Sequence, residues 1–101
     1  MALEIQWTTR ADIKLDHLII YLESEWGESV VKAFMKKLYD FLEILSEFPE
    51  IGSMQYPEKS IRGFSLTKQV SVFYKIDGNQ IILLDLFDNR SNPKRKTRSN
   101  I

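Results

Sequence analysis

The sequence predicts a small two-layer α+β domain, in which an αα-hairpin packs on one face of a four-stranded, mostly antiparallel sheet. Three observations predict it. The first residues alternate in the period of a strand, two amphipathic stretches follow, and three strand-like runs come after residue 59. The element order is therefore β-α-α-β-β-β. A chain of 101 residues supports one hydrophobic core, so we expect a single domain over residues 1–101.

The first strand and the first helix follow directly from local patterns. Residues 3–7 alternate apolar and polar side chains, as in a half-buried strand. Thr8 or Thr9 suits a helix N-cap, with Asp12 as a capping-box-like partner. The helix that follows carries one apolar stripe, and Gly27 ends it. The stripe consists of Leu15, Leu18, Ile19, Leu22 and Trp26.

A second helix begins near Glu28 or Ser29 and ends before Pro49, because the residue before a proline avoids helical dihedral angles. Two amphipathic helices joined by a glycine turn predict an αα-hairpin. The apolar stripe of the second helix consists of Val31, Phe34 or Met35, Leu38, Leu42 and Leu45, with Phe41 and Phe48 broadening it.

Three strands complete the predicted sheet, at residues 60–66, 70–76 and 81–87, while residues 51–59 read as a loop. Asp77-Gly78 predicts a tight hairpin between the last two strands. We expect the first strand to pair in parallel with the last. The last strand is apolar almost throughout, which predicts burial on both of its faces before the chain surfaces at Arg90.

Composition excludes several kinds of chemistry. The chain has no cysteine, so it has no disulfide, thiolate metal site or cysteine nucleophile. One histidine, His17, with scattered carboxylates does not supply a metal site, and no phosphate-binding glycine motif is present. We therefore expect no metal and no cofactor. No signal peptide and no membrane-spanning run is seen, so we expect a cytoplasmic protein without a membrane partner.

The net charge of zero conceals an uneven distribution. Five bases and no acid follow residue 88, which leaves nine bases and 14 acids in residues 1–88, a net charge of −5. We expect residues 91–101 to be a basic tail that contacts phosphates or an acidic partner, unless it is simply a solvated terminus. The predicted phosphate- or target-binding residues are Arg90, Lys94, Arg95 and Lys96.

Basic side chains also gather near one end of the predicted sheet, where Arg62 and Lys68 join Arg90. Arginines without a histidine or a metal suit two tasks. They bind phosphate through the guanidinium fork, or they stabilise the charge that develops when a ribose 2′-hydroxyl attacks its phosphate. The second task also requires a group that moves protons, and a tyrosine or lysine would need a strongly shifted pKa to serve.

The helical hairpin carries more apolar side chains than a small sheet can cover. An exposed apolar surface of this size usually marks a partner site. We expect an amphipathic, acidic segment of a partner protein to lie in a groove there, and a homodimer that buries the same surface is the alternative. The residues concerned are Ile13, Ile20, Tyr21, Val30, Met35, Tyr39 and Phe41.

Nearly the whole chain resembles the RelE/ParE superfamily of bacterial toxins, including members labelled plasmid-stabilisation toxins. The resemblance lies in the combined order and spacing of its segments rather than in one motif. These segments are Trp7-Thr8, Trp26-Gly27, Ile61-Arg62-Gly63-Phe64, Val72-Phe73-Tyr74-Lys75-Ile76 and the exit Phe87-Asp88-Asn89-Arg90-Ser91-Asn92-Pro93.

The resemblance implies a growth-inhibiting toxin of a type II toxin–antitoxin pair, bound and silenced by a short antitoxin. The apolar hairpin residues named above are the expected site for that antitoxin. Family members either poison DNA gyrase, as ParE does, or cut mRNA on the ribosome without a metal, as RelE does. The ribonuclease branch has an arginine where this chain has Ser71, and a tyrosine or histidine in a tail that here has neither.

These departures favour the ParE-like mode. The alternatives are a RelE-like endoribonuclease with Arg90, Arg62 and Lys68 as its catalytic residues, or an inert protein-binding module of the same fold.

Overall fold

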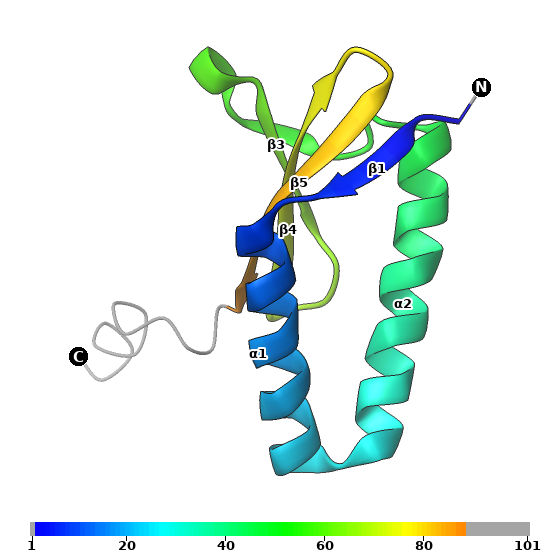
Figure 1. Cartoon of the computed structure of the whole chain (residues 1–101), viewed down its shortest axis with the longest axis vertical. Helices are drawn as coiled ribbons and strands as arrows, with labels where there is room; N and C mark the ends of the chain where they lie inside the picture. Colours follow the sequence, from blue (N-terminus) through cyan, green and yellow to red (C-terminus); the bar gives the residue numbers. More distant parts are fainter. Residues whose placement is uncertain (1, 89–101) are drawn as a thin grey trace.

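The computed structural model describes residues 2–88 and shows two helices and a five-stranded sheet. Strand β1 (Glu4–Trp7) leads into helices α1 (Thr9–Trp26) and α2 (Glu28–Glu47). The two helices run antiparallel and meet at Gly27, at the lower end of Figure 1. The remaining elements are β2 (Ser53–Tyr56), the short 3-10 helix η1 (Pro57–Lys59), β3 (Ile61–Ser65), β4 (Val70–Asp77) and β5 (Gln80–Asp88).

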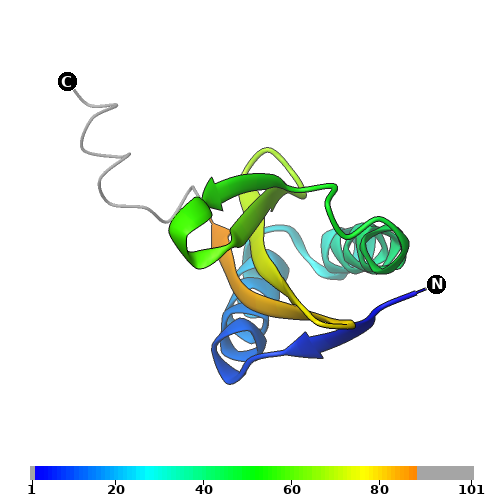
Figure 2. The same cartoon turned by 90° about the horizontal axis from the view of Figure 1, so that it is seen from above.

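The strand order is β1-β5-β4-β3-β2, so β4 is the central strand and β5 lies between β1 and β4. Strand β1 pairs with β5 in parallel, which confirms the expected direction, and the other pairs are antiparallel. Seen from above, the strands fan round in a strong twist (Figure 2). The parallel pairing aligns Trp7 with Leu83, so the chain enters α1 beside the middle of β5.

The core lies between the helices and one face of the sheet. Strands β4 and β5 contribute inward-facing buried residues, and α1 and α2 contribute most of the apolar stripes predicted from their spacing. Trp26 and Phe48 were expected in those stripes, but they are 49% and 65% exposed. The two layers of the predicted α+β fold are therefore confirmed. The buried residues are Ala11, Leu18, Leu22, Phe34, Leu38, Phe41, Leu45, Leu66, Val70, Val72, Tyr74, Ile81, Leu83 and Leu86.

The sheet has five strands, so the prediction of four was wrong. Residues 51–59 were expected to form a loop, but Ser53–Tyr56 pairs with β3 as an edge strand. All four of its side chains are exposed, so no alternation between buried and exposed positions marks it in the sequence. A bulge between Met54 and Tyr56 and the following Pro57 keep this strand short, which limits pairing with another chain at this edge.

The expectation that β5 is buried on both faces was also wrong for the described residues. Ile81, Leu83 and Leu86 are buried against the helices, whereas Ile82, Leu84 and Phe87 on the other face are only half-buried. A register shift opposite Phe73 and Tyr74 adds one residue to β5. The extra residue lets Leu84 and Asp85 both lie away from the core, and it creates an outer surface with apolar and charged side chains side by side.

Candidate functional site

A carboxylate on β5 joins the sheet to the first turns of α1. Asp85 Oδ2 lies 3.1 Å from Arg10 Nε, and its Oδ1 lies 3.1 Å from Lys14 Nζ. Lys14 also donates to the carbonyl of Leu86 and lies 5.9 Å from the centre of the Phe87 ring. Asp85 is therefore neutralised by two cations close to the end of β5, where the chain leaves the described structure.

Thr8 sets the position of these cations. Its hydroxyl accepts a hydrogen bond from the Ala11 N–H, as a helix N-cap does, and donates to the carbonyl of Leu83. The same oxygen thus caps α1 and fastens its start to β5. Since Arg10 and Lys14 are four residues apart, they share one face of the helix, which turns both toward Asp85.

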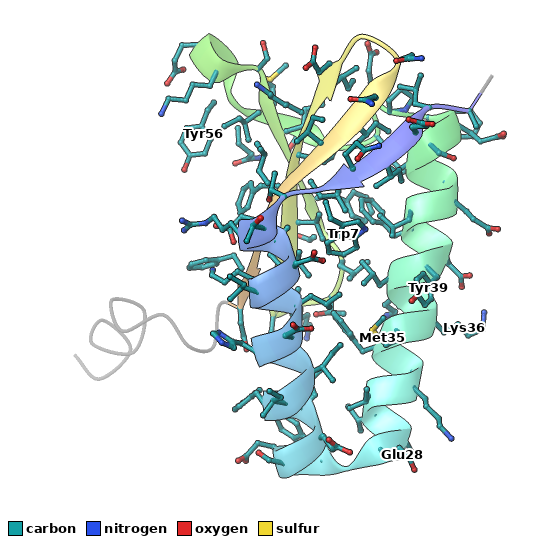
Figure 3. All side chains as sticks on the ribbon, in the orientation of Figure 1. Trp7, Glu28, Met35, Lys36, Tyr39 and Tyr56 are labelled. Carbon is teal, nitrogen blue, oxygen red and sulfur yellow. The ribbon has the colours of Figure 1, made fainter. Side chains whose placement is uncertain are left out.

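A hollow of about 550 Å³ opens beside this cluster on the outer face of the sheet. Aromatic and aliphatic side chains form most of its wall, and Arg10 and Asp85 supply its charge. Figure 3 places Tyr56 on the side of the molecule away from α2. The lining residues are Thr8, Arg10, Tyr56, Ile61, Phe73, Leu84, Asp85 and Phe87.

Arg62, one of the predicted catalytic residues, holds a loop in place. Its Nη1 lies 2.8 Å from the carbonyl oxygen of Gly52 and 3.4 Å from that of Glu50. The guanidinium is half-buried and faces the segment between α2 and β2. A phosphate at this position would compete with these two carbonyls for the same N–H groups.

Tyr74 lies directly opposite Arg62 in the β3–β4 pairing and is fully buried. Its hydroxyl donates to the carbonyl of Pro49 and accepts from the Gly52 N–H, each at 2.8 Å. Burial raises the pKa of this hydroxyl, although the Gly52 hydrogen bond and the Arg62 charge act in the opposite direction. Tyr74 is therefore a neutral tyrosine that ties β4 to the loop after α2.

Lys68 lies elsewhere, in the turn between β3 and β4, and is exposed. Thr67 shapes this turn, since its hydroxyl accepts hydrogen bonds from the N–H groups of Gln69 and Val70. Val70 pairs with Asp88, so the turn lies beside the last described residue of β5. The structure therefore brings Lys68, but not Arg62, to the end of the sheet from which the chain continues toward Arg90.

The four predicted target-binding residues lie outside the described residues 2–88. They are Arg90, Lys94, Arg95 and Lys96, and their assignment stays a prediction.

A second hollow, of about 380 Å³, separates the closed end of the helical hairpin from the β3–β4 turn. Helices α1 and α2 supply its apolar wall, and Lys37 supplies a positive charge at its edge. The lining residues are Leu22, Trp26, Val30, Ala33, Phe34, Lys37, Thr67, Gln69 and Val70. We call this surface the hairpin groove.

The residues predicted to bind the antitoxin are divided between several surfaces. Ile13 and Ile20 are 48% and 64% exposed and lie two helical turns apart on α1, but neither lines the hairpin groove. Val30 does line it. Tyr21 and Met35 are half-buried against the core, and Tyr39 is 60% exposed.

Phe41 was expected on that partner surface, but the structure places it in the core. It is 4% exposed and stacks on Phe64 of β3, with ring centres 4.5 Å apart. Its position near the apolar stripe of α2 made the two placements hard to separate by helical spacing alone.

Other functional groups are sparse in the described part of the chain. Residues 2–88 hold no cluster of three or more histidine, cysteine or acidic side chains that suits a metal ion, and His17 is exposed on α1. No described helix is both long and apolar enough to cross a membrane.

Sequence reasoning missed the Arg10–Lys14–Asp85 cluster. The available signal was Asp85 itself, because a lone carboxylate within an apolar strand requires a partner. The partners come from 71 and 75 residues away, and only the parallel pairing of β1 with β5 identifies them.

The chain matches one protein-family model by sequence and several solved structures by fold. Residues 5–93 match the family model for the ParE toxin of the type II toxin–antitoxin system parDE. No curated protein sequence matches the chain.

Solved structures share the fold at low sequence identity. The chromosomal ParDE toxin–antitoxin system from P. aeruginosa matches with a TM-score of 0.71 and 16% identity, over 86% of this chain and 96% of that one. The toxin–antitoxin complex RelBE2 from Mycobacterium tuberculosis matches with a TM-score of 0.59 and 16% identity, over 87% and 99%. The YoeB dimer from Staphylococcus aureus gives 0.59 and 13%, over 86% and 97%.

The family match covers most of the chain, and the α+β fold agrees with it. This chain therefore belongs to the ParE toxin family of type II toxin–antitoxin systems.

Proposed function

We propose that the protein arrests growth by binding a protein target, in the ParE-like mode with DNA gyrase as that target, and that a cognate antitoxin silences it. Residues Arg90, Lys94, Arg95 and Lys96 form its target-binding end. The protein acts in the cytoplasm and, when encoded on a plasmid, stabilises that plasmid. Its family membership supports the toxin role.

The observation that carries this proposal is the commitment of Arg62 and Tyr74 to the loop after α2. The Arg62 guanidinium is bound to backbone carbonyls, and the Tyr74 hydroxyl is buried and doubly hydrogen-bonded. RNA cleavage without a metal needs a cation at the phosphate and a group that moves a proton. On the described sheet, Arg62 is the candidate cation and Tyr74 the candidate for moving a proton, but both are bound to the backbone of the loop after α2. Their use in the fold favours binding over catalysis.

An antitoxin segment suits the hairpin groove. The groove is apolar and bordered by Lys37, so an amphipathic segment with acidic residues matches its chemistry. Exposed Trp26 at its edge, 49% accessible, offers the kind of large aromatic anchor that dominates protein interfaces. Val70 lines the groove and pairs with Asp88 at the end of β5, so an acidic segment bound there can continue toward the basic tail, where charge attracts it.

Controlled expression without an antitoxin tests the toxin role. We expect growth arrest from the wild-type chain and relief from Arg90→Ala or from a combined Lys94→Ala, Arg95→Ala and Lys96→Ala variant. Lys59→Ala, which removes an exposed lysine from η1, is the matched control and should stay toxic. Normal growth at high expression of folded wild-type protein would leave only the inert binding module.

The mode is tested in the arrested cells and with purified gyrase. The proposal expects gyrase-linked DNA breaks and induction of the SOS response, without new mRNA ends. Codon-associated mRNA breaks mapped by primer extension would instead establish the endoribonuclease alternative. That result would draw attention to Lys68, whose turn lies beside Asp88, the last described residue of β5.

A further inference from the structure

Helix α2 carries charges in two blocks of opposite sign. Residues 28–37 contain three lysines and one glutamate, a net charge of +2, whereas residues 38–47 contain three acids and no base, a net charge of −3. This order opposes the helix dipole, which favours acids near the N-terminus and bases near the C-terminus. No basic residue lies in the last turn of α2. The pattern therefore does not serve the isolated helix.

Side chains of like charge also lie one helical turn apart on the exposed face of α2. Lys32 and Lys36 are four residues apart, and so are Glu43 and Glu47; all four are exposed. Each such pair destabilises an isolated helix by about 0.2–0.5 kcal/mol. Lys36 gains one partner in its own helix, Asp40, at 3.0 Å. Within residues 2–88, no ion pair offsets the charges of Lys32, Glu43 or Glu47.

The two blocks are symmetric about one point. The point lies midway between Tyr39 and Asp40. Lys36 and Glu43 are each 3.5 residues from it, on opposite sides. Lys32 and Glu47 are likewise equidistant from it, about one helical turn further out. A second copy of α2, packed antiparallel about a two-fold axis at that point, therefore sets Lys36 against Glu43 and Lys32 against Glu47. Lys37 takes no part, since it lines the hairpin groove. A two-fold interface of this kind uses the same patch on both chains.

An exposed aromatic side chain lies at the centre of the pattern. Tyr39 is 60% exposed, and in this arrangement the two copies of Tyr39 meet next to the axis. Figure 3 shows Tyr39 and Met35 along one side of α2 and Lys36 pointing away from the body of the molecule. Tyrosine is enriched at protein interfaces because it buries a large area and keeps a polar tip.

We propose that the chain forms a homodimer through α2, in which Lys32 and Lys36 of one copy face Glu47 and Glu43 of the other. The inference does not rest on the proposed function, because it concerns the protein without an antitoxin or a target. Exposed ion pairs contribute little each, so the dimer is weak and sensitive to salt. Since Tyr39 was expected to contact the antitoxin, an antitoxin that covers Tyr39 would dissociate the dimer.

Sedimentation of the full chain, made in a cell-free system, tests the dimer. We expect association at low salt that weakens as the salt concentration rises. The double variants Lys32→Glu with Lys36→Glu, and Glu43→Lys with Glu47→Lys, should each raise the dissociation constant about tenfold or more, because every facing pair becomes repulsive. Circular dichroism checks that both variants fold.

Mixing the two double variants gives the decisive result. One carries only acids at the four positions and the other only lysines, so the mixture should form a heterodimer although neither variant associates alone. A wild-type chain that stays monomeric at every concentration and at low salt would overturn the proposal. So would a dimer that survives in both double variants, because it would use another face.

Cross-linking locates the axis independently. The chain has no cysteine, so Asp40→Cys introduces a single thiol next to the proposed axis. The two copies should cross-link with a short bismaleimide. Glu28→Cys is the matched control, since its two copies would lie about 35 Å apart along the helices. Equal cross-linking of the two variants would contradict the antiparallel register.

Discussion

The hydroxyl of Tyr74 lies 2.8 Å from the backbone nitrogen of Gly52, across 22 residues of sequence. The same hydroxyl donates to the carbonyl of Pro49, so one side chain on the central part of the sheet satisfies two backbone groups of the loop that leaves α2. Arg62 binds the carbonyl of Gly52. Together these contacts fix the path from the helices into the edge strand β2.

Replacing Tyr74 with phenylalanine should destabilise the fold although the ring is kept. The variant leaves the Gly52 N–H and the Pro49 carbonyl without their partner inside the protein, at a cost of about 1–3 kcal/mol. Urea unfolding followed by circular dichroism measures the difference. Tyr39→Phe, at an exposed tyrosine, is the matched control and should change stability little. Equal stability of the two variants would mean that the buried hydrogen bonds contribute nothing.

The raised pKa of Tyr74 predicts a loss of stability in alkali. The unfolded chain releases this proton near its ordinary pKa, whereas the folded chain holds it to higher pH. The folded state thus binds more protons, so the free energy of unfolding falls as pH rises above about 10. The loss continues until the pKa of the folded state is passed. Unfolding curves of wild type and Tyr74→Phe should therefore converge with pH, and parallel curves would contradict the shift.

Gly52 should tolerate no side chain. A Cβ atom there would lie 2.7 Å from the Tyr74 hydroxyl oxygen and 2.9 Å from the carbonyl oxygen of Gly63. Gly52→Ala should cost about 1–3 kcal/mol through this overpacking. Ser53→Ala, at the exposed neighbour, is the control. The double variant Gly52→Ala, Tyr74→Phe should be less unstable than the sum of the singles, since one clash disappears with the hydroxyl.

The spacing of apolar residues predicted the helices and strands that bury a regular set of side chains. It did not predict an element that exists only through backbone pairing with its neighbour. The two helices and β4 repeat apolar side chains at a fixed interval, and β5 is an almost continuous apolar run after a hairpin turn, so their positions follow from the sequence. The edge strand β2 buries none of its side chains and exists through its pairing with β3, so it carries no such interval.

The same limit applies to the candidate site. From the sequence, Arg62 resembles a phosphate ligand. Its actual partners are the backbone carbonyls of Glu50 and Gly52, and a contact with the backbone leaves no signal in the residue types. Spacing placed Phe41 among several outward-facing residues of α2, although its ring stacks on Phe64 of β3. Lys68 was expected near the exit of β5, and the pairing of Val70 with Asp88 does bring its turn there.

Arg62→Ala should lower stability, because the Gly52 carbonyl loses its donor, whereas Lys68→Ala should leave stability nearly unchanged. We expect about 1–2 kcal/mol for the first and at most about 0.5 kcal/mol for the second. Urea unfolding of both variants gives the comparison. If Lys68→Ala also retains full toxicity, the turn makes no essential target contact. If Arg62→Ala is as stable as wild type, the guanidinium is free for another role.

Asp85→Asn should reveal how much the two ion pairs on α1 contribute. Arg10 is largely exposed, so its pair adds little, while Lys14 is better shielded by Phe87 and Leu86. The loss should stay below about 1 kcal/mol and shrink at high salt. Asp77→Asn, at an exposed acid in the β4–β5 hairpin, is the control for removing one charge. A loss that does not change with salt would point to packing rather than charge.

Thr8 joins the start of α1 to β5 through one oxygen atom. The helix cap and the bond to β5 can be distinguished experimentally. Thr8→Val removes the cap on the Ala11 N–H and the bond to the Leu83 carbonyl, so we expect a loss of about 1–2 kcal/mol. Thr8→Ser keeps both bonds and should remain within about 0.5 kcal/mol of wild type. Hydrogen exchange distinguishes the causes. If loss of the N-cap dominates in Thr8→Val, amide exchange should accelerate only in the first turn of α1. If loss of the bond to Leu83 dominates, amide exchange in β1 and β5 should accelerate as well.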